Sequence, residues 1–112
     1  MFHWPKRGGD ASEGDRAAFR DYGDLKGQVT VISGSTSGIG LALARAVAAR
    51  GGDVVLNGLG DPSEIERTRA ELEASCGVRV RYHGADMRKG EEVADMVAFA
   101  RHELGRLDIL VN

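Results

Sequence analysis

The feature that most constrains this chain is a glycine-rich stretch lying between a β-branched run and an alanine-rich run. Residues 29–32 read Val-Thr-Val-Ile, residues 33–40 read Ser-Gly-Ser-Thr-Ser-Gly-Ile-Gly, and residues 41–50 read Leu-Ala-Leu-Ala-Arg-Ala-Val-Ala-Ala-Arg. β-Branched residues favour strands, whereas Ala, Leu and Arg are strong helix formers. These segments predict a strand, a tight turn and a helix that stops at Gly51, a residue suited to the left-handed conformation.

The alternation of strand and helix continues along the chain. Further strands are predicted at residues 53–57, 78–83 and 107–111, with helices at 61–76 and 90–104. Parallel strands need long crossover connections, and these are almost always right-handed. We therefore expect an α/β fold, a Rossmann-type doubly wound parallel sheet of order 3-2-1-4 that is truncated after the fourth strand. A ligand crevice is expected at the carboxyl ends of the first and fourth strands, where the chain reverses direction.

Two units are expected within the 112 residues. Residues 1–27 lack a sustained hydrophobic period and are predicted to be a flexible leader. Residues 28–112 are predicted to form the N-terminal half of a dinucleotide-binding Rossmann domain.

Composition narrows the possible partners. The formal net charge of −2, with acidic and basic residues interleaved, offers no basic stripe for nucleic acid. No apolar run approaches the roughly 20 residues that cross a bilayer, so no membrane partner is expected. Cys76 is the sole cysteine and is predicted to be a buried apolar residue in a reducing cytoplasm, with no metal site around it.

Each glycine of the turn can be given a physical task. Gly34 lets the chain leave the strand sharply, Gly38 lets backbone amides approach a diphosphate, and Gly40 permits close packing of helix on sheet. A diphosphate would then lie at the positive end of the helix dipole. Hydroxyl donors are expected beside it from Ser35, Thr36 and Ser37. A turn that binds nothing is the alternative, but a strand before and a helix after the glycines favour nucleotide binding.

Residues 26–112 resemble the short-chain dehydrogenase/reductase family. The family's T-G-x-x-x-G-I-G loop, acidic residue after the third strand and N-N-A-G turn correspond to residues 33–40, Asp86 and Asn112, with Ser33 in place of the usual threonine. The resemblance implies an oxidoreductase acting on a CH–OH group, in which Asp86 accepts from the adenine amino group and the Met87 amide meets the ring. The implied cofactor-binding residues are Gly34, Ser35, Thr36, Ser37, Gly38, Ile39, Gly40, Asn57, Gly58, Leu59, Asp86, Met87 and Asn112.

Finer similarities concern residues 54–66 and 79–87, which resemble segments of the bacterial 3-hydroxybutyrate dehydrogenases of this family. They imply a homotetrameric full-length relative that oxidises 3-hydroxybutyrate to acetoacetate with NAD. NADP is less favoured because residues 57–61 contain no Arg or Lys for its 2′-phosphate. The acid that usually selects NAD is replaced by Asn57, and Asp61 is better explained as a helix cap.

The family's catalytic serine and Tyr-x-x-x-Lys pair are implied to lie beyond residue 112, so this chain is expected to be inactive and to contain no catalytic residue. Tyr22 and Lys26 have the pair's spacing, but they precede the first strand among glycines and acids. His83 and His102 are interpreted as structural or solvated residues.

Two alternatives remain open. The chain could be a non-catalytic nucleotide-binding or partner-binding module, or part of another short-chain reductase with a ketoacyl or sugar substrate. In either case the predicted fourth strand has an open edge, which predicts self-association through that strand.

Overall fold

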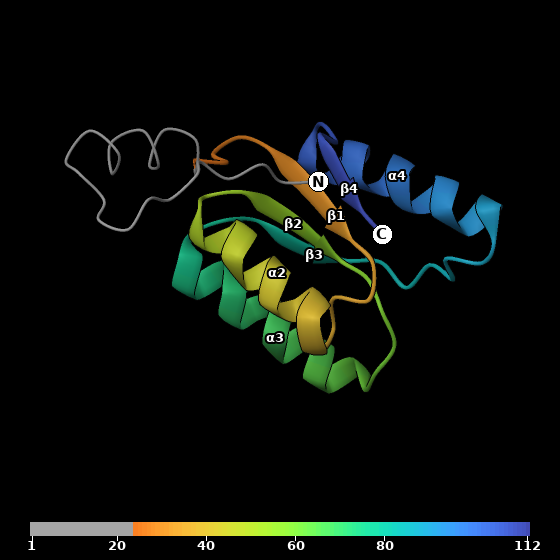
Figure 1. The fold of residues 1–112 in the computed structure, drawn as a ribbon, viewed down its shortest axis with the longest axis horizontal. Coiled ribbons are helices and arrows are strands. Elements are labelled where there is room, and N and C mark those ends of the chain that lie inside the picture. Colours follow the sequence, from red (N-terminus) through yellow and green to blue (C-terminus); the bar gives the residue numbers. More distant parts are fainter. Residues whose placement is uncertain (1–23) are drawn as a thin grey trace, which may run out of the picture.

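A computed structural model describes residues 24–112, which form four strands and three helices in alternation (Figure 1). In chain order these are β1 (Val29–Ile32), α2 (Gly38–Ala49), β2 (Asp53–Leu56), α3 (Pro62–Cys76), β3 (Val80–Tyr82), α4 (Gly90–Leu104) and β4 (Ile109–Val111). The strands form one parallel sheet of order β3-β2-β1-β4, which confirms the predicted topology.

Helices cover both faces of the sheet (Figure 1). Side chains alternate along a strand, so β1 sends Ile32 towards α2 and α3, and Val29 and Val31 towards α4. The first core includes Val47 of α2 and Leu72 of α3, and the second includes Met96, Ala100 and Leu104 of α4. β1 and β2 are buried along their whole length, so apart from Thr30 and Asp53 their residues are apolar on both faces rather than alternating.

The helix ends follow the signals in the sequence. Asp61 caps α3, because its carboxylate accepts a hydrogen bond from the Glu64 amide at 3.1 Å, and Pro62 is the first helical residue. The chain leaves α2 through Gly51 with a φ of 86° and leaves α4 through Gly105 with a φ of 84°. The predicted bounds of α4 are confirmed at both ends.

Three sequence predictions need correction. The leader does not extend to residue 27: Leu25 is buried and its amide donates to the Arg50 carbonyl at 2.9 Å, so residues 24–27 pack against the domain. The third and fourth strands are shorter than predicted, since only Val80–Tyr82 and Ile109–Val111 pair with a neighbouring strand. Cys76 is only partly buried, because it lies in the last turn of α3 at the margin of the core.

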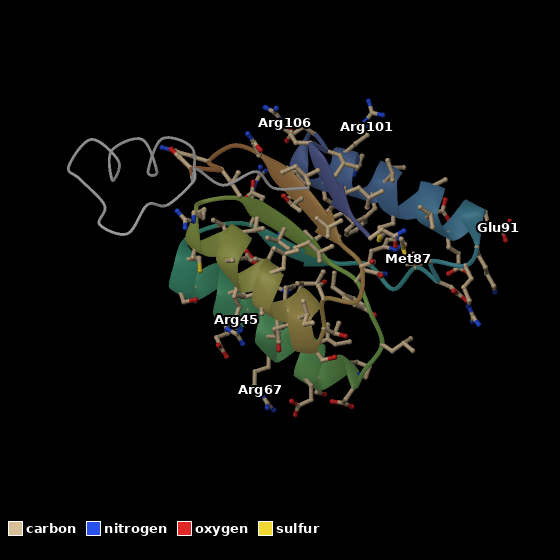
Figure 2. The ribbon with its side chains drawn as sticks, viewed as in Figure 1. Arg45, Arg67, Met87, Glu91, Arg101 and Arg106 are labelled. Atoms are coloured by element: carbon tan, nitrogen blue, oxygen red, sulfur yellow. The ribbon has the colours of Figure 1, made fainter. Side chains whose placement is uncertain are left out.

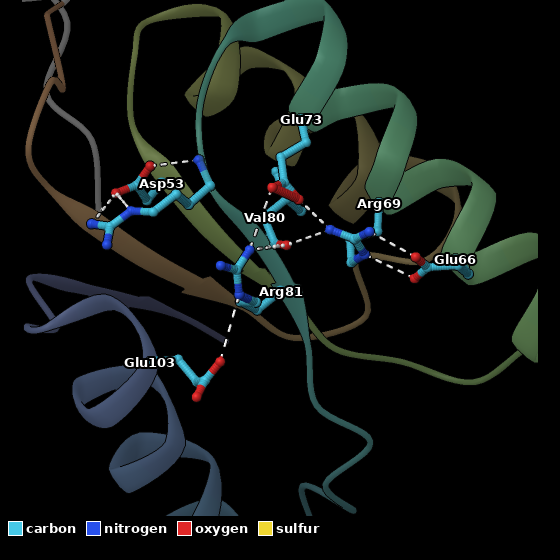
Figure 3. Close-up of polar contacts among 8 residues, drawn as sticks. Asp53, Glu66, Arg69, Glu73, Val80, Arg81 and Glu103 are labelled. Carbon is cyan, nitrogen blue, oxygen red and sulfur yellow. Dashed lines mark hydrogen bonds and ion pairs between the residues drawn. The ribbon is translucent and has the colours of Figure 1, made fainter.

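The two edges of the sheet differ. At the β3 edge, the Val80 carbonyl accepts hydrogen bonds from the guanidinium groups of Arg69 at 3.1 Å and Arg81 at 3.0 Å. These arginines pair with Glu66, Glu73 and Glu103, so charged side chains cover this edge (Figure 3). At the β4 edge, no strand within residues 24–112 pairs with the outer side of β4, and Leu110 is 43% exposed.

Candidate functional site

The glycine turn follows β1 at the carboxyl edge of the sheet, and its backbone needs glycine. Gly34 and Gly38 have φ values of 61° and 60°, in the left-handed region. A Cβ atom on Gly40 would lie 2.1 Å from the carbonyl oxygen of Gly34, a contact that backbone atoms cannot relieve by rotating a side chain. Gly40 therefore makes a close backbone contact, as predicted. The atoms that it approaches belong to the glycine turn itself.

The amino end of α2 presents backbone amides that have no hydrogen-bond partner within residues 24–112. The first hydrogen bond of the helix joins the Leu41 amide to the Ser37 carbonyl at 3.2 Å, so the amides of Gly38, Ile39 and Gly40 have no acceptor within the helix. The first turn carries no acidic residue, and the Ser37 side chain makes no capping hydrogen bond. This helix end can therefore bind an anion such as a diphosphate.

Two of the three hydroxyl groups expected beside a phosphate are used by the protein instead. Ser35 is fully buried, and its hydroxyl donates to the Ile32 carbonyl at 2.7 Å while accepting from the Asn57 amide at 2.9 Å. The Thr36 hydroxyl donates to the Leu59 carbonyl at 2.7 Å. These contacts fasten the glycine turn to the chain that follows β2, and they leave Ser37 with the exposed hydroxyl.

A second set of contacts joins the loops that follow β2 and β3. Asn57 is 2% exposed, and its side-chain amide donates to the carbonyls of His83 at 2.9 Å and Ala85 at 3.0 Å. The Tyr82 hydroxyl donates to the Gly58 carbonyl at 2.6 Å. The Asn57 side chain therefore holds the two loops together, and Gly58 and Leu59 are left to form the surface beside them.

Between these two loops lies a cavity of about 390 Å³, lined by Asn57, Gly58, Leu59, Gly84, Ala85, Asp86, Met87 and Arg88. Leu59 is 93% exposed on one side. On the other, Met87 packs against the core under α4, beside the carboxyl end of the sheet (Figure 2). The sequence-predicted residues after β2 and β3 are thus brought together at one cavity.

Asp86 is a charged acceptor at the rim of this cavity. The Arg88 guanidinium donates to both carboxylate oxygens at 3.0 Å, and the Arg88 amide donates to Oδ1 at 3.0 Å. These hydrogen bonds, with a smaller contribution from the charge of Lys89, lower the pKa of Asp86 to about 2. Asp86 is therefore ionised at neutral pH and able to accept from a donor such as an amino group.

Asn112 and Ser33 bring the end of β4 beside the glycine turn. The Ser33 amide donates to the Val111 carbonyl at 2.9 Å, and the Ser33 hydroxyl lies 3.4 Å from Oδ1 of Asn112. The serine at this position thus contacts Asn112 through its hydroxyl. Both residues lie where the sheet reverses its winding, which is the predicted position of the crevice.

Neither histidine lies in a reactive arrangement. Nδ1 of His83 accepts from the Ala85 amide at 3.1 Å, and its ring packs 5.1 Å from the ring of Phe99. The His102 side chain is 86% exposed beside Glu103. Lys26 lies in the turn before β1, while Tyr22 is outside the described residues. Within residues 24–112, no group of three His, Cys, Asp or Glu side chains could hold a metal ion, and no helix is long and apolar enough to cross a membrane.

Sequence reasoning missed three residues of this region. Tyr82 supports Gly58, Glu92 of α4 accepts from the Asp86 amide at 2.9 Å, and Arg88 holds the Asp86 carboxylate. The Asp-x-Arg spacing of residues 86–88 was the available signal for Arg88. Tyr82 and Glu92 could not be assigned, since their partners depend on how the loops fold.

A parallel sheet of order 3-2-1-4, a glycine turn entering a helix and a cavity beside it define a Rossmann-type nucleotide-binding domain. The profile of the short chain dehydrogenase family matches residues 28–112. The chain belongs to this family of oxidoreductases, which bind nicotinamide dinucleotides.

Similar proteins are longer than this chain. A D-beta-hydroxybutyrate dehydrogenase of Cupriavidus necator is 47% identical over 79% of this chain and 33% of its own length. One from Rhizobium meliloti is 48% identical over 76% of this chain and 33% of its own length. The chain therefore spans about a third of these relatives.

Solved structures show the same arrangement. L-sorbose reductase of Gluconobacter frateurii, in complex with NADPH and L-sorbose, matches with a TM-score of 0.72 and 37% identity over 80% of this chain and 34% of its own. The NADPH-dependent 3-quinuclidinone reductase of Rhodotorula rubra matches with a TM-score of 0.76 and 32% identity, over 96% of this chain and 37% of its own.

Proposed function

We propose that residues 28–112 form the NAD-binding part of a dehydrogenase that oxidises 3-hydroxybutyrate to acetoacetate. The observation that carries the proposal is the unpaired amino end of α2, which faces outward from a turn that only glycine can form at Gly40. The relatives named D-beta-hydroxybutyrate dehydrogenase support the substrate, because their identity of 47–48% exceeds the 37% of the sorbose reductase.

The residues present fit a dinucleotide. The amides of Gly38, Ile39 and Gly40 would hold the diphosphate, and Ser37 would add its hydroxyl. Gly58 and Leu59 would lie against the adenosine, with Asp86 and the Met87 amide at the edge of the adenine. The Met87 amide donates to no acceptor within residues 24–112, so it is available to a ring nitrogen. When bound, nicotinamide supplies the hydride acceptor, while these residues bind and orient the dinucleotide.

The charges around the cavity favour NAD over NADP. The stretch from Asn57 to Asp61 contains no base, and Arg88 is the only basic residue that lines the cavity of the described structure. Its guanidinium is already paired with Asp86, which offsets its charge. A 2′-phosphate would therefore find no unpaired cation here.

The proposal includes two further expectations. The chain alone is expected to be inactive, since the family's catalytic Tyr-x-x-x-Lys pair and serine are proposed to belong to the part of the relatives that it does not cover. The open edge of β4 is proposed to bind another strand, from a second copy of the chain or from the rest of a longer protein.

Titration followed by backbone amide NMR signals tests the proposal. On folded chain, NAD is expected to move the signals of residues 34–40, 57–59 and 86–87 and to bind more tightly than NADP. Ser37→Glu is expected to weaken NAD binding about tenfold, because its carboxylate would oppose the diphosphate. Ser75→Glu, at an exposed position near the end of α3, is the matched control and is expected to leave affinity unchanged. Unmoved signals in the glycine turn would contradict the proposal.

Turnover is tested separately. Purified chain with NAD and 3-hydroxybutyrate is expected to form no NADH, measured as absorbance at the wavelength where only the reduced nicotinamide absorbs. Detectable formation of NADH would contradict the expectation that the chemistry needs residues outside this chain.

A further inference from the structure

Arg88 holds Asp86 in a way that the family motif does not explain. Its guanidinium donates through Nε to Oδ1 and through Nη2 to Oδ2, each at 3.0 Å, while its backbone amide also donates to Oδ1. The Arg88 side chain is 89% exposed and gains little from packing, whereas the Asp86 side chain is 28% exposed at the cavity rim. The contact therefore orients the carboxylate more than it stabilises the arginine.

We propose that Arg88 is a positioning residue that fixes Asp86 as an acceptor for the 6-amino group of adenine, so that the site discriminates against purines carrying a 6-oxo group. This inference rests on the proposed dinucleotide function and adds a residue to it.

Most acceptor sites of the Asp86 carboxylate are already used by Arg88. An ionised carboxylate has about four lone-pair sites. Arg88 occupies both sites of Oδ1 and one site of Oδ2, so a single site on Oδ2 remains for an external donor. A freely rotating carboxylate would offer either oxygen, whereas this one offers Oδ2 alone.

The backbone of Asp86 is also held in place. Its amide donates to Glu92 Oε1 at 2.9 Å, and its carbonyl accepts from the Lys89 amide at 2.9 Å. With the backbone fixed by α4 and the carboxylate fixed by Arg88, the open site of Oδ2 keeps one position relative to Leu59 and Met87, which line the same cavity. A planar base held there would meet the same acceptor each time it binds.

The chemistry of that acceptor decides which base is favoured. The 6-amino group of adenine donates a hydrogen bond, and the charged acceptor strengthens it. The 6-oxo group of hypoxanthine is an acceptor, so its oxygen would face a carboxylate with no proton between them. Arg88 contributes by holding that carboxylate in place.

The test compares NAD with nicotinamide hypoxanthine dinucleotide, using calorimetric titration of the whole 112-residue chain. The starting protein is expected to bind NAD at least about tenfold more tightly than the hypoxanthine analogue, a ratio typical of one charge-assisted hydrogen bond. Arg88→Gln is expected to reduce this ratio about fivefold or more, mainly by weakening NAD. Arg88→Lys keeps the charge but loses the bidentate hydrogen bonds. It is expected to retain more of the affinity ratio than Arg88→Gln does.

Arg106→Gln is the matched control. Arg106 pairs with Asp108 through the same two-residue spacing, but it lies at the opposite end of the sheet from Met87 (Figure 2). Its replacement is expected to leave the ratio of affinities unchanged. Amide spectra of each variant verify that the fold is retained.

The outcomes separate the inference from the proposed function. If the starting protein binds neither dinucleotide, both are overturned. If it binds NAD, but Arg88→Gln keeps the full preference for adenine or binds NAD more tightly, the positioning role is overturned while NAD binding stands.

Discussion

Gly40 carries the most demanding backbone contact of the glycine turn. Its missing side chain lets the first turn of α2 lie against Gly34, whose carbonyl oxygen and carbon would be 2.1 Å and 2.7 Å from a Cβ atom. Both are backbone atoms in a turn that is also fixed by Ser35. The turn therefore cannot yield without breaking the contacts that join β1 to β2.

Gly40→Ala is therefore expected to destabilise the domain by about 1–3 kcal/mol, the usual range for overpacking. Chemical denaturation followed by circular dichroism measures the change. Gly90→Ala is the matched control: a Cβ on Gly90, at the start of α4, would meet nothing within 4 Å. That variant is expected to gain about 0.4–1 kcal/mol by lowering the entropy of the unfolded chain. Equal effects at the two glycines would contradict this account.

Asn57 is a structural residue as much as a member of the cavity wall. Asn57→Asp removes both side-chain donors and sets a carboxylate against the carbonyls of His83 and Ala85. We expect a loss of about 1–3 kcal/mol for each carbonyl left unpaired, measured by urea denaturation. Gln28→Glu makes the same chemical change in a side chain with no hydrogen bond in residues 24–112, and it is expected to have little effect. A stable Asn57→Asp variant would show that the loops do not depend on this amide.

The ion pair of Asp86 and Arg88 predicts an unusual titration. Since the pKa of Asp86 is lowered from 3.8 to about 2, the contribution of the pair to folding stability is fully present above pH 3.8 and is lost as the pH falls through about 2. Carboxyl carbon NMR shifts are expected to show Asp86 still ionised at pH 3. Arg88→Gln is expected to raise the midpoint towards 3.8, because it removes the main cause of the shift. A midpoint near 3.8 in the starting protein would contradict the bidentate contact.

At the scale of elements, the helix ends differ in how they are capped. Asp61 caps α3 with its side chain, whereas Lys89 precedes α4 without a side-chain hydrogen bond to it. Asp61→Ala is expected to destabilise the domain by about 1 kcal/mol, as measured by thermal denaturation. Asp61→Asn keeps an acceptor and is expected to retain most of the stability. If Asp61→Ala and Asp61→Asn have the same melting temperature, the side-chain oxygen at position 61 does not stabilise the domain as a cap.

The elements that could be predicted from the sequence are those with local signals. The strand–turn–helix at residues 29–50, the cap at Asp61 and the stop at Gly105 each depend on neighbouring residues, and all are confirmed. The end of the leader was misplaced because Leu25 is held by Arg50. Strand lengths also depend on partners distant in sequence.

In the candidate site, too, features with local signals could be predicted and those that depend on distant partners could not. The turn glycines were assigned from their spacing, and in the structure Gly34 and Gly38 have left-handed φ values of 61° and 60°. The hydroxyl of Ser35 was assigned to a ligand, but it is buried against Asn57, which is distant in sequence. Arg88 was missed because its role depends on how the loop after β3 lies against the loop after β2.

At the scale of the whole molecule, the sheet has one protected edge and one open edge. Arg69 and Arg81 occupy the outward carbonyl of Val80, so a strand approaching β3 would have to displace two guanidinium groups. No side chain within residues 24–112 hydrogen-bonds to the outer edge of β4 in this way, and Leu110 is 43% exposed on it. Natural sheets protect the edges that remain edges, so we expect any further strand to add at β4 rather than at β3.

Self-association through β4 is therefore expected for the chain on its own, with a mass that rises with concentration in sedimentation equilibrium. Leu110→Lys places a charge on that strand and is expected to shift the material towards monomer. Leu59→Lys is the matched control, because it makes the same change at a side chain that is 93% exposed but lies away from the edge. If Leu59→Lys rather than Leu110→Lys dissociates the chain, association proceeds through the cavity loops instead. If the starting protein is monomeric at all concentrations, the open edge does not recruit a second copy and the expectation of self-association is wrong.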